Sequence, residues 1–446
     1  MKFSKHIDQQ HKPFKEALSA LIRIPSVLVE GEEGPPFGKP IDDALRLTLK
    51  IAEDLGFRVT YGPDGYYGYA EIGQGDGLVA VLGHIDVVPP GDLDLWETGP
   101  YEPVEREGKL FGRGAKDDKG PTLAALFAAK ALIDAGVDFK KRLRFIFGTD
   151  EESLWRCMTL YNQREEKAGL GFTPDAEFPL IYAEKGLLQF TLTCPNTSSL
   201  KIEGGSSFNA VPDHIFYSGD DEDALAGQLD MLGFEYERTH TGIKVLGKAA
   251  HAMSTEHGIN AIARLCIALD AMGGGSNAVR FVVDVLGEDP FGTGLFGVIE
   301  DEPSGRLKCN VGKIKLGTEE KLSIDIRIPV TIEKSKIVDE LLNAAEKYDL
   351  AYTEWDWEPP LYLPKDDPLI KTLMRVYQDE TGDMESEPSS TGGATYARTM
   401  ESCVAFGPHF PGSARVAHQP NEYIVLDDMY QAMAIYAQSL FLLTCT

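Results

Sequence analysis

The chain has 446 residues, and because single hydrophobic cores stop growing near roughly 250 to 300 residues, we expect at least two domains. Its 43 Lys and Arg residues stand against 70 Asp and Glu residues, and the resulting net charge of −27 argues against nucleic acid or anionic membrane surfaces as partners. No apolar stretch is long enough for a membrane span and the N-terminus is polar, so a cytoplasmic location is expected. The six cysteines show no Cys-x-x-Cys spacing, which favours free buried thiols over disulfides or a thiolate metal site.

Helix-like and strand-like segments alternate over the early part of the chain. Apolar spacing and turn residues predict helices over residues 14–24, 41–55 and 121–135, and strands over 58–61, 67–72, 78–82 and 143–147. Such alternation is typical of an α/β sheet covered by helices. Because ligands bind beyond the carboxyl ends of the strands in such sheets, the polar residues after 82 and after 147 are the first candidates for a site.

The first candidate is an apolar strand that reaches a glycine and then delivers His84 and Asp86. Residues two apart in extended backbone project from one face, so these side chains are expected to lie together. A metal-bound imidazole is usually held on its other nitrogen by a carboxylate or a carbonyl group, and Asp86 is placed for that role. The same pattern fits a buried strand ending in a hydrogen-bonded histidine, but the segments that follow favour a metal site.

Further carboxylates and a second histidine follow along the chain. Residues 112–121 (GRGAKDDKGP) combine tight glycine turns with two aspartates at the start of a predicted helix. Residues 148–152 (GTDEE) place three acids directly after a strand, where a solvated charged face is the alternative interpretation. Asp175 lies in a turn bracketed by prolines, and His418 lies in a loop ahead of the last predicted helix. Together these residues indicate a site of nitrogen and oxygen ligands.

From about residue 184 the sequence changes to β-rich segments with helices between them, which indicates an inserted α+β domain. Strands are predicted over residues 187–194, 243–245, 279–285, 312–316 and 322–328, and helices over 221–232, 258–272 and 333–347. Two later helices, predicted over residues 368–382 and 427–443, return the chain to the first domain.

Five motifs in this order resemble the M20 metallopeptidase family, and within it the bacterial dipeptidases of the PepV and Sapep type. They are residues 83–88 (GHIDVV), 112–121 (GRGAKDDKGP), 148–152 (GTDEE), 174–179 (PDAEFP) and 417–418 (AH). The resemblance covers nearly the whole chain. It implies a zinc-peptidase-like α/β/α catalytic domain in two parts, residues 1–183 and 366–446, with an inserted α+β lid domain at residues 184–365.

The resemblance also implies which residues bind metal. It makes Asp117 the carboxylate that bridges two divalent ions. His84 and Asp175 complete the shell of one ion, and Glu152 and His418 complete the shell of the other. Nitrogen and oxygen ligands without thiolates suit zinc, manganese or cobalt, and zinc is the first expectation.

Three further residues match catalytic roles in the family. Glu151 matches the general base, and Asp86 matches the residue that steadies the His84 ring. Adjacent side chains diverge in extended backbone, so Glu152 can bind metal while Glu151 reaches the attacking water. His251, in the insert, matches a histidine that stabilises the tetrahedral oxyanion.

Four positions resemble substrate-binding residues: Asn209, Arg327, Gly392 and Gly393. Arg327 is implied to grip the terminal carboxylate of the substrate through a bidentate pair, and the two glycines to allow close approach of backbone to substrate. Without the resemblance, Asn209 would be interpreted as a turn residue, Arg327 as part of a strand salt bridge, His251 as a surface histidine and the glycines as a flexible loop.

The expected function is that of a cytoplasmic two-metal dipeptidase whose substrate is a dipeptide. A monomer is favoured because the insert could complete the site within one chain. The main alternative is an N-acyl-L-amino-acid amidohydrolase. In the family, however, an aspartate rather than a glutamate at the position of Asp175 favours peptidases that act on substrates with a free amino end. A metal-dependent peptide-binding protein without catalysis is disfavoured by the intact Glu151. Relatives in the family often have a glycine near the position of Trp155, whereas this chain has the bulky tryptophan there. This difference predicts a narrower substrate pocket.

Overall fold

The computed structural model describes residues 3–31, 34–196, 198–219 and 221–446. The chain forms two compact units. The first unit comprises Met1–Tyr182, Leu363–Ser389 and Thr395–Thr446, and the second comprises Ala183–Tyr362 and Ser390–Ala394. The domain boundaries expected from the sequence, after residues 183 and 365, lie within three residues of the unit boundaries after Tyr182 and Tyr362. The segment Ser390–Ala394 was expected in the catalytic part, but it groups with the second unit.

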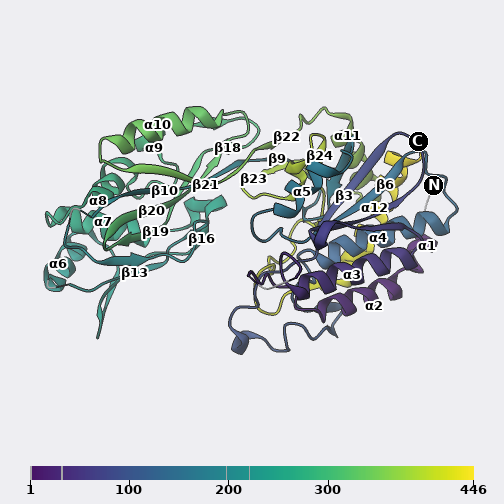
Figure 1. Ribbon diagram of the computed structural model, residues 1–446, viewed down its shortest axis with the longest axis horizontal. Coiled ribbons are helices and arrows are strands. Elements are labelled where there is room, and N and C mark those ends of the chain that lie inside the picture. The colour runs from purple at the N-terminus through teal and green to yellow at the C-terminus, as the bar shows by residue number, and fades with distance from the viewer. Residues whose placement is uncertain (1–2, 32–33, 197, 220) are drawn as a thin grey trace. The chain divides into compact units, whose positions relative to one another are not determined.

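The first unit is an α/β structure (Figure 1). Its helices are α1 (Ser4–Asp8), α2 (His11–Ile22), α3 (Lys39–Asp54), α4 (Lys119–Asp134), α5 (Arg156–Arg164), α11 (Pro368–Thr381) and α12 (Leu426–Thr444). Its strands are β1 (Arg58–Tyr61), β2 (Tyr67–Ile72), β3 (Leu78–His84), β4 (Val104–Arg106), β5 (Lys109–Phe111), β6 (Arg142–Gly148), β7 (Leu170–Thr173), β8 (Ala176–Glu177), β24 (Cys403–Ala405), β25 (Pro408–His409) and β26 (Tyr423–Val425). The main sheet has the order β1-β2-β6-β3-β7-β24 and continues to β9 (Ile181–Glu184).

Strand pairing shows that α3 and α4 cover one face of this sheet. Gly68 in β2 and Gly83 in β3 are both paired with Phe147 in β6, so their side-chain positions lie on the same face. A Cβ at Gly68 would press on two leucines of α3, and a Cβ at Gly83 would overlap the hydroxyl of Thr122 in α4. Gly83 therefore allows α4 to approach β3 closely at its N-terminal turn.

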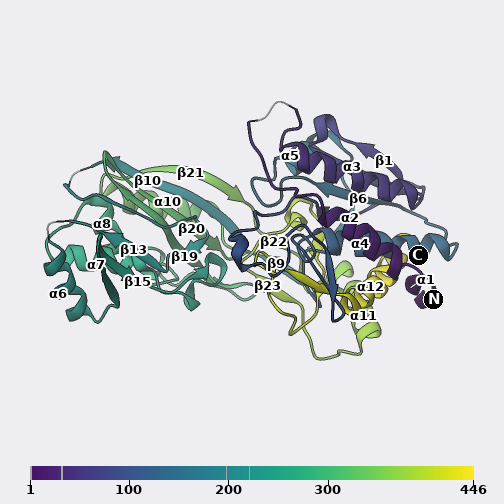
Figure 2. The same cartoon turned by 90° about the horizontal axis from the view of Figure 1, so that it is seen from below.

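The opposite face is covered by α5 and by the 3-10 turn η5 (Tyr396–Thr399). Tyr67 and His84 are both paired with Gly148 and so share this face. The ring centroids of Tyr67 and of Tyr161 in α5 lie 5.2 Å apart, and those of His84 and Tyr396 lie 6.2 Å apart. Helical layers on both faces make this unit an α/β/α sandwich, as predicted (Figure 2).

The second unit is built on an antiparallel five-stranded sheet with the order β11-β19-β20-β10-β21. Its strands are β10 (Gly186–Pro195), β11 (Ile202–Gly204), β12 (Ala210–Val211), β13 (His214–Tyr217), β14 (Tyr236–Thr239), β15 (Gly242–Leu246), β16 (Ala250–His251), β17 (Glu300–Asp301), β18 (Gly305–Arg306), β19 (Lys308–Leu316), β20 (Glu319–Ile328), β21 (Ala351–Glu358), β22 (Leu361–Tyr362) and β23 (Ser389–Thr391). Its helical elements are α6 (Glu222–Leu232), α7 (Ala261–Ala271), α8 (Asn277–Phe281), η4 (Val282–Leu286), α9 (Thr293–Phe296) and α10 (Lys334–Glu346). This mixture confirms the α+β character predicted for the insert.

The prediction of a strand over residues 279–285 is wrong, because this segment is helical and spans α8 and the π-helical turn η4. Two side chains accept hydrogen bonds from backbone N–H groups at the start of α8. The Ser276 side chain accepts the N–H of Val279, and the Glu320 carboxylate accepts the N–H of Ala278 at 2.7 Å. Capping and burial in the core of the second unit therefore override the β-propensity of the valine-rich run.

No helix in the described parts of the chain combines the length and the apolar character that a membrane span requires.

We expect substitutions in α4 to destabilise the first unit strongly, because this helix is buried along nearly its whole length. Leu126 in this helix is 0% exposed, and truncating it to alanine leaves a cavity, so Leu126→Ala should lower the free energy of unfolding by about 2–5 kcal/mol. Leu93 is 60% exposed, and Leu93→Ala should change it by less than about 0.5 kcal/mol. Chemical denaturation followed by circular dichroism tests this, and equal effects of the two substitutions would contradict it.

Candidate active site

Three neighbouring strands of the first unit bring the candidate residues together. β3 pairs in parallel with β6 on one side and with β7 on the other, so their carboxyl ends meet at the same edge of the sheet. His84 ends β3, the acidic segment 149–152 follows β6, and Asp175 follows β7. The sequence-based expectation that the segments after residues 82 and 147 meet beyond the strand ends is confirmed, and the structure adds Asp175 through β7, a strand that the sequence pattern did not predict.

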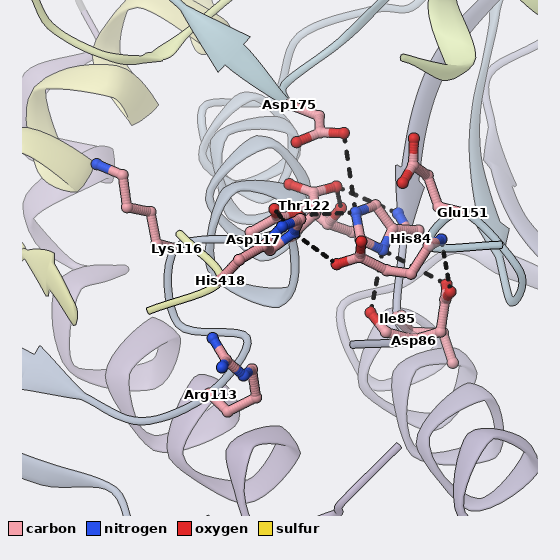
Figure 3. A network of polar contacts seen from close by, with 12 residues as sticks. His84, Ile85, Asp86, Arg113, Lys116, Asp117, Thr122, Glu151, Asp175 and His418 are labelled. Atoms are coloured by element: carbon pink, nitrogen blue, oxygen red, sulfur yellow. Dashed lines mark hydrogen bonds and ion pairs between the residues drawn. The ribbon is translucent and has the colours of Figure 1, made fainter. Parts of the chain in front are cut away.

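His84 is fully buried and is contacted on both ring nitrogens. Its Nδ1 lies 3.0 Å from the carbonyl oxygen and 3.4 Å from the carboxylate of Asp86. Its Nε2 lies 3.0 Å from Asp117 Oδ1 and 3.8 Å from Asp175 Oδ2 (Figure 3). Asp86 also accepts the backbone N–H of Glu152 at 3.0 Å, and so ties the end of β3 to the segment after β6.

Asp117 lies between the two histidines. While its Oδ1 contacts His84, its Oδ2 lies 2.9 Å from Nε2 of His418. The same His418 nitrogen lies 3.1 Å from Glu152 Oε1. All five predicted metal ligands are thus in one cluster within the first unit. Donor atoms of His84, Asp117 and Glu152 lie within 4.8 Å of one another, as do those of His84, Glu151 and Asp175.

Asp117 is positioned by the approach of α4 to β3. The next residue, Asp118, precedes α4 and is fully buried, and its carboxylate accepts the N–H of His84 at 3.2 Å and the hydroxyl of Thr122 at 2.7 Å. Because Gly83 leaves room for Thr122, the helix start and the strand end are joined through Asp118. This joint places Asp117 beside the imidazole of His84.

Trp155, which the sequence suggested would narrow the pocket, is only 7% exposed. Its indole N–H donates to the carbonyl oxygen of Glu151 at 2.7 Å, and its ring packs against Tyr396 at 5.4 Å. Trp155 therefore supports the backbone that carries Glu151. Its effect on substrate range stays a prediction.

The two histidines bind protons strongly in the absence of a metal ion. Burial lowers the pKa of His84, but hydrogen bonds to Asp117 and Asp86 outweigh it and hold the pKa well above its ordinary value. Burial likewise opposes the charged form of His418, but Asp117 and Glu152 raise its pKa to about 11. Each imidazole is stabilised as a cation because carboxylates surround it.

The positive charge around the carboxylates is too small to balance their negative charges. Burial, together with repulsion from neighbouring acids, raises the pKa of Glu151, of Glu152 and of Asp175. Burial also disfavours the charged form of Asp117, but hydrogen bonds to the two histidines hold its pKa well below the usual range. A half-buried cluster of this composition is stabilised by cations, and its nitrogen and oxygen donors fit divalent metal ions.

Two residues outside the predicted set support this cluster. Glu422 is fully buried; it accepts the N–H groups of Lys116 at 2.8 Å and of Asp117 at 3.2 Å, and a hydrogen bond from Arg113 at 2.6 Å. Arg113 lies inside the predicted motif of residues 112–121, and Glu422 lies four residues after His418. The positions of this arginine and this glutamate at metal motifs could have marked both as candidate site residues. The sequence does not reveal, however, that the two form an ion pair.

The remaining predicted residues lie in the second unit, where the structure links them to one another. Asn209 precedes β12, which pairs with β16 at His251, and the Asn209 carbonyl oxygen accepts the N–H of Ala252 at 2.8 Å. Arg327 in β20 is 2% exposed, and its Nη1 donates to the carbonyl oxygen of Gly392 at 2.8 Å. Gly393 follows directly and donates its N–H to Thr391 at 3.0 Å.

Arg327 is already paired. Its Nε and Nη2 donate to the two carboxylate oxygens of Asp325 at 2.7 and 3.0 Å, so the strand salt bridge considered from the sequence is present. A bidentate pair of this kind fixes the plane of the guanidinium group. The substrate-binding role of Arg327 stays a prediction.

Sequence comparison gives the family. The sequence model of peptidase family M20/M25/M40 matches residues 80–441, which is most of the chain. The chain belongs to this family. The resemblance and the enzyme class predicted from the motifs are therefore confirmed, and an M20 metallopeptidase works with divalent metal ions.

Two bacterial relatives match this M20 metallopeptidase over nearly its full length. It is 38% identical over 445 residues to the putative dipeptidase YtjP of Bacillus subtilis (strain 168), covering 94% of this chain and 95% of the relative. It is 35% identical over 451 residues to the putative dipeptidase SAUSA300_1697 of Staphylococcus aureus (strain USA300), covering 95% of each.

Solved structures show the same fold for this M20 chain. Human carnosine dipeptidase 1 matches with a TM-score of 0.61 and 18% identity, and the dipeptidase Dug1p of Saccharomyces cerevisiae with a TM-score of 0.62 and 16% identity; 98% of each chain is covered in both comparisons. At these identities the likeness concerns the fold. It confirms a zinc-peptidase-like α/β/α domain with an inserted α+β lid domain.

The raised pKa values predict that metal binding releases protons. His418 has a folded-state pKa of about 11 against an ordinary 6.5, so its stabilising contribution is complete below pH 6.5 and is lost as the pH rises toward 11. Metal-free protein should therefore melt at a lower temperature at pH 9.5 than at pH 7. Added Co²⁺ should displace at least about one proton per chain at pH 7, because metal ligands bind deprotonated. Calorimetric titration in two buffers of different ionisation heat measures this, and a buffer-independent heat would contradict it.

Proposed function

We propose that this M20 metallopeptidase is a two-metal dipeptidase that hydrolyses the peptide bond of dipeptides. The observation that carries the proposal is the position of Asp117, whose two carboxylate oxygens face two different histidines at 3.0 and 2.9 Å. A carboxylate between two sets of ligands is suited to bridge two cations. The names of the bacterial relatives, both putative dipeptidases, support the substrate class.

In the proposed site, His84 and Asp175 hold one ion with Asp117, while Glu152 and His418 hold the other with Asp117. Zinc is the first choice for these nitrogen and oxygen donors, with manganese or cobalt as alternatives. Two such ions would supply a water of lowered pKa and would polarise the scissile carbonyl group.

The chain's own residues then move the proton. Glu151 takes a proton from the attacking water and passes it to the leaving amine. Asp86 keeps the His84 ring in orientation through its contacts at Nδ1.

Roles for Asn209, His251, Arg327, Gly392 and Gly393 are proposed on the motifs alone. Arg327 would recognise the terminal carboxylate of the dipeptide, and His251 would stabilise the oxyanion. The neighbourhood of these residues within the second unit is compatible with one shared task.

We also propose that the enzyme works as a monomer in the cytoplasm. The motifs of catalytic and substrate-binding type all occur in one chain, which supports the monomer. A stable dimer in light scattering would contradict it.

Glu151 should be required for turnover but not for metal binding. Metal-stripped protein supplied with zinc, manganese or cobalt should release amino acids from a dipeptide panel. Glu151→Gln should lower kcat by roughly 10²–10⁴-fold, because general-base catalysis contributes about that much, and should leave metal content unchanged. The matched control is Glu166→Gln, which alters an exposed acid paired with Arg142 and should retain full activity. Full activity of Glu151→Gln would contradict the assignment.

Free dipeptides should be cleaved in preference to their N-acetyl forms. This comparison separates the dipeptidase from the N-acyl-amino-acid amidohydrolase. Faster cleavage of the N-acetylated compounds would favour the amidohydrolase, and tight dipeptide binding without any turnover would favour a binding protein.

Arg327 should set the preference for a free terminal carboxylate. In the wild-type enzyme kcat/KM should be higher for a dipeptide than for its C-terminal amide, and in Arg327→Ala the two values should converge. Loss of a buried charge pair also destabilises by roughly 3–5 kcal/mol, so folding is checked by circular dichroism. The ratio between the two substrates corrects for partial unfolding, and an unchanged ratio would contradict the role.

A further inference from the structure

A buried ion pair connects the loop that carries Asp117 to the loop that carries His418. Arg113 is 1% exposed and Glu422 is 0% exposed, and Nη1 of Arg113 lies 2.6 Å from Oε2 of Glu422. The other oxygen of Glu422 accepts the N–H groups of Lys116 and of Asp117 itself. The Glu422 carboxylate thus touches the backbone of a predicted metal ligand directly.

Arg113 extends the connection to two further segments. Its Nη1 also donates to the carbonyl oxygen of Gln419, the residue after His418, at 3.4 Å, and its Nη2 donates to that of Pro89 at 3.3 Å. Its guanidinium lies 5.4 Å from the ring of Trp96. In Figure 3 the Arg113 side chain lies below those of Asp117 and His418 and away from His84. Arg113 therefore contacts the surroundings of the cluster while lying outside it.

The turn after His418 is held in an unusual conformation. His418 has a φ of 62° and Asn421 a φ of 59°, a left-handed region that residues with a side chain rarely adopt. The Asn421 side chain accepts the N–H of Glu97 at 2.8 Å and donates to the carbonyl oxygen of Leu95 at 2.9 Å. Such a conformation persists where surrounding contacts impose it. Asn421 and the adjacent Glu422 provide those contacts.

We propose that Arg113 and Glu422 are positioning residues that fix the separation of Asp117 and His418 and so determine the affinity for the ion these two ligands share. This inference rests on the proposed two-metal site. Without the Glu422 carboxylate, the N–H of Asp117 loses its charged acceptor and the buried Arg113 loses its counter-charge. The ion taken by His418 loses more affinity than the ion taken by His84 and Asp175, because the latter pair does not contact Arg113 or Glu422.

The test compares Glu422→Gln with a matched buried pair in the same unit. Arg144 and Glu71 are also buried, and Nε and Nη2 of Arg144 donate to one oxygen of Glu71 at 2.9 and 2.7 Å. This pair joins β6 to β2 and touches no predicted ligand. Glu71 also accepts a hydrogen bond from Arg58 at 3.2 Å, so Glu71→Gln reports the effect of weakened ion pairing away from the candidate site.

Binding of Co²⁺ is measured by competition with a chelator, and its visible absorption reports ligand geometry. Glu422→Gln should bind one of two Co²⁺ ions roughly 10–100-fold more weakly, the usual effect of losing a residue that orients metal ligands, and its cobalt spectrum should change. Glu71→Gln should melt at a lower temperature with unchanged affinities and spectrum. Arg113→Lys, which keeps the charge but loses the planar fork, should show an intermediate loss of affinity.

Equal Co²⁺ affinities in wild-type protein and Glu422→Gln would overturn the inference, and so would an equal loss in Glu71→Gln. If Glu422→Gln does not fold, Arg113→Lys decides by the same two readouts. Wild-type protein that binds two ions but cleaves no dipeptide would overturn the dipeptidase proposal alone, because the affinity comparison does not depend on turnover. Wild-type protein that binds fewer than two ions would overturn the two-metal site and the inference together.

Discussion

The candidate site of the first unit depends on the close gathering of half-buried carboxylates around two histidines. Taken alone, such a gathering is unfavourable, because like charges in a poorly solvated space repel one another. The chain can meet this cost in two ways, which compete because a metal ion binds a histidine nitrogen only after its proton has left. It holds protons on His84 and His418, and it presents donors that fit divalent cations. The affinity for protons and the affinity for metal thus have the same physical origin.

Much of this arrangement was predictable because strand ends have regular geometry. His84 and Asp86 were predicted to share one face at the end of a strand, and the acids after residue 147 to join them, since parallel strands end at one edge of the sheet. His418 was different. It lies on an irregular turn far along the chain, and only the resemblance to a family connected it with Asp117. Local pattern does not specify such a long-range contact.

The failures of sequence reasoning have a common cause in tertiary contacts. Residues 279–285 favour a strand by composition, but Ser276 and Glu320 cap a helix there. Arg113 and Glu422 received no role, although the first lies within a motif and the second close to one, because pairing across more than three hundred residues leaves no local trace. The hydrogen bond of Trp155 to the carbonyl oxygen of Glu151 and its packing on Tyr396 are tertiary contacts that the sequence likewise did not reveal, while the expected narrowing of the pocket stays a prediction.

The grouping of Ser390–Ala394 with the second unit affects how the two parts can be exchanged. This pentapeptide is separated from the rest of that unit by a stretch that includes α11, yet its Gly392 carbonyl receives a hydrogen bond from Arg327. A chimaera that replaced Ala183–Tyr362 as one block would keep the old pentapeptide beside a new arginine or none. Modular recombination of such enzymes thus needs the exchange of two separate gene segments, and exchange of the first segment alone leaves a mismatch at Gly392.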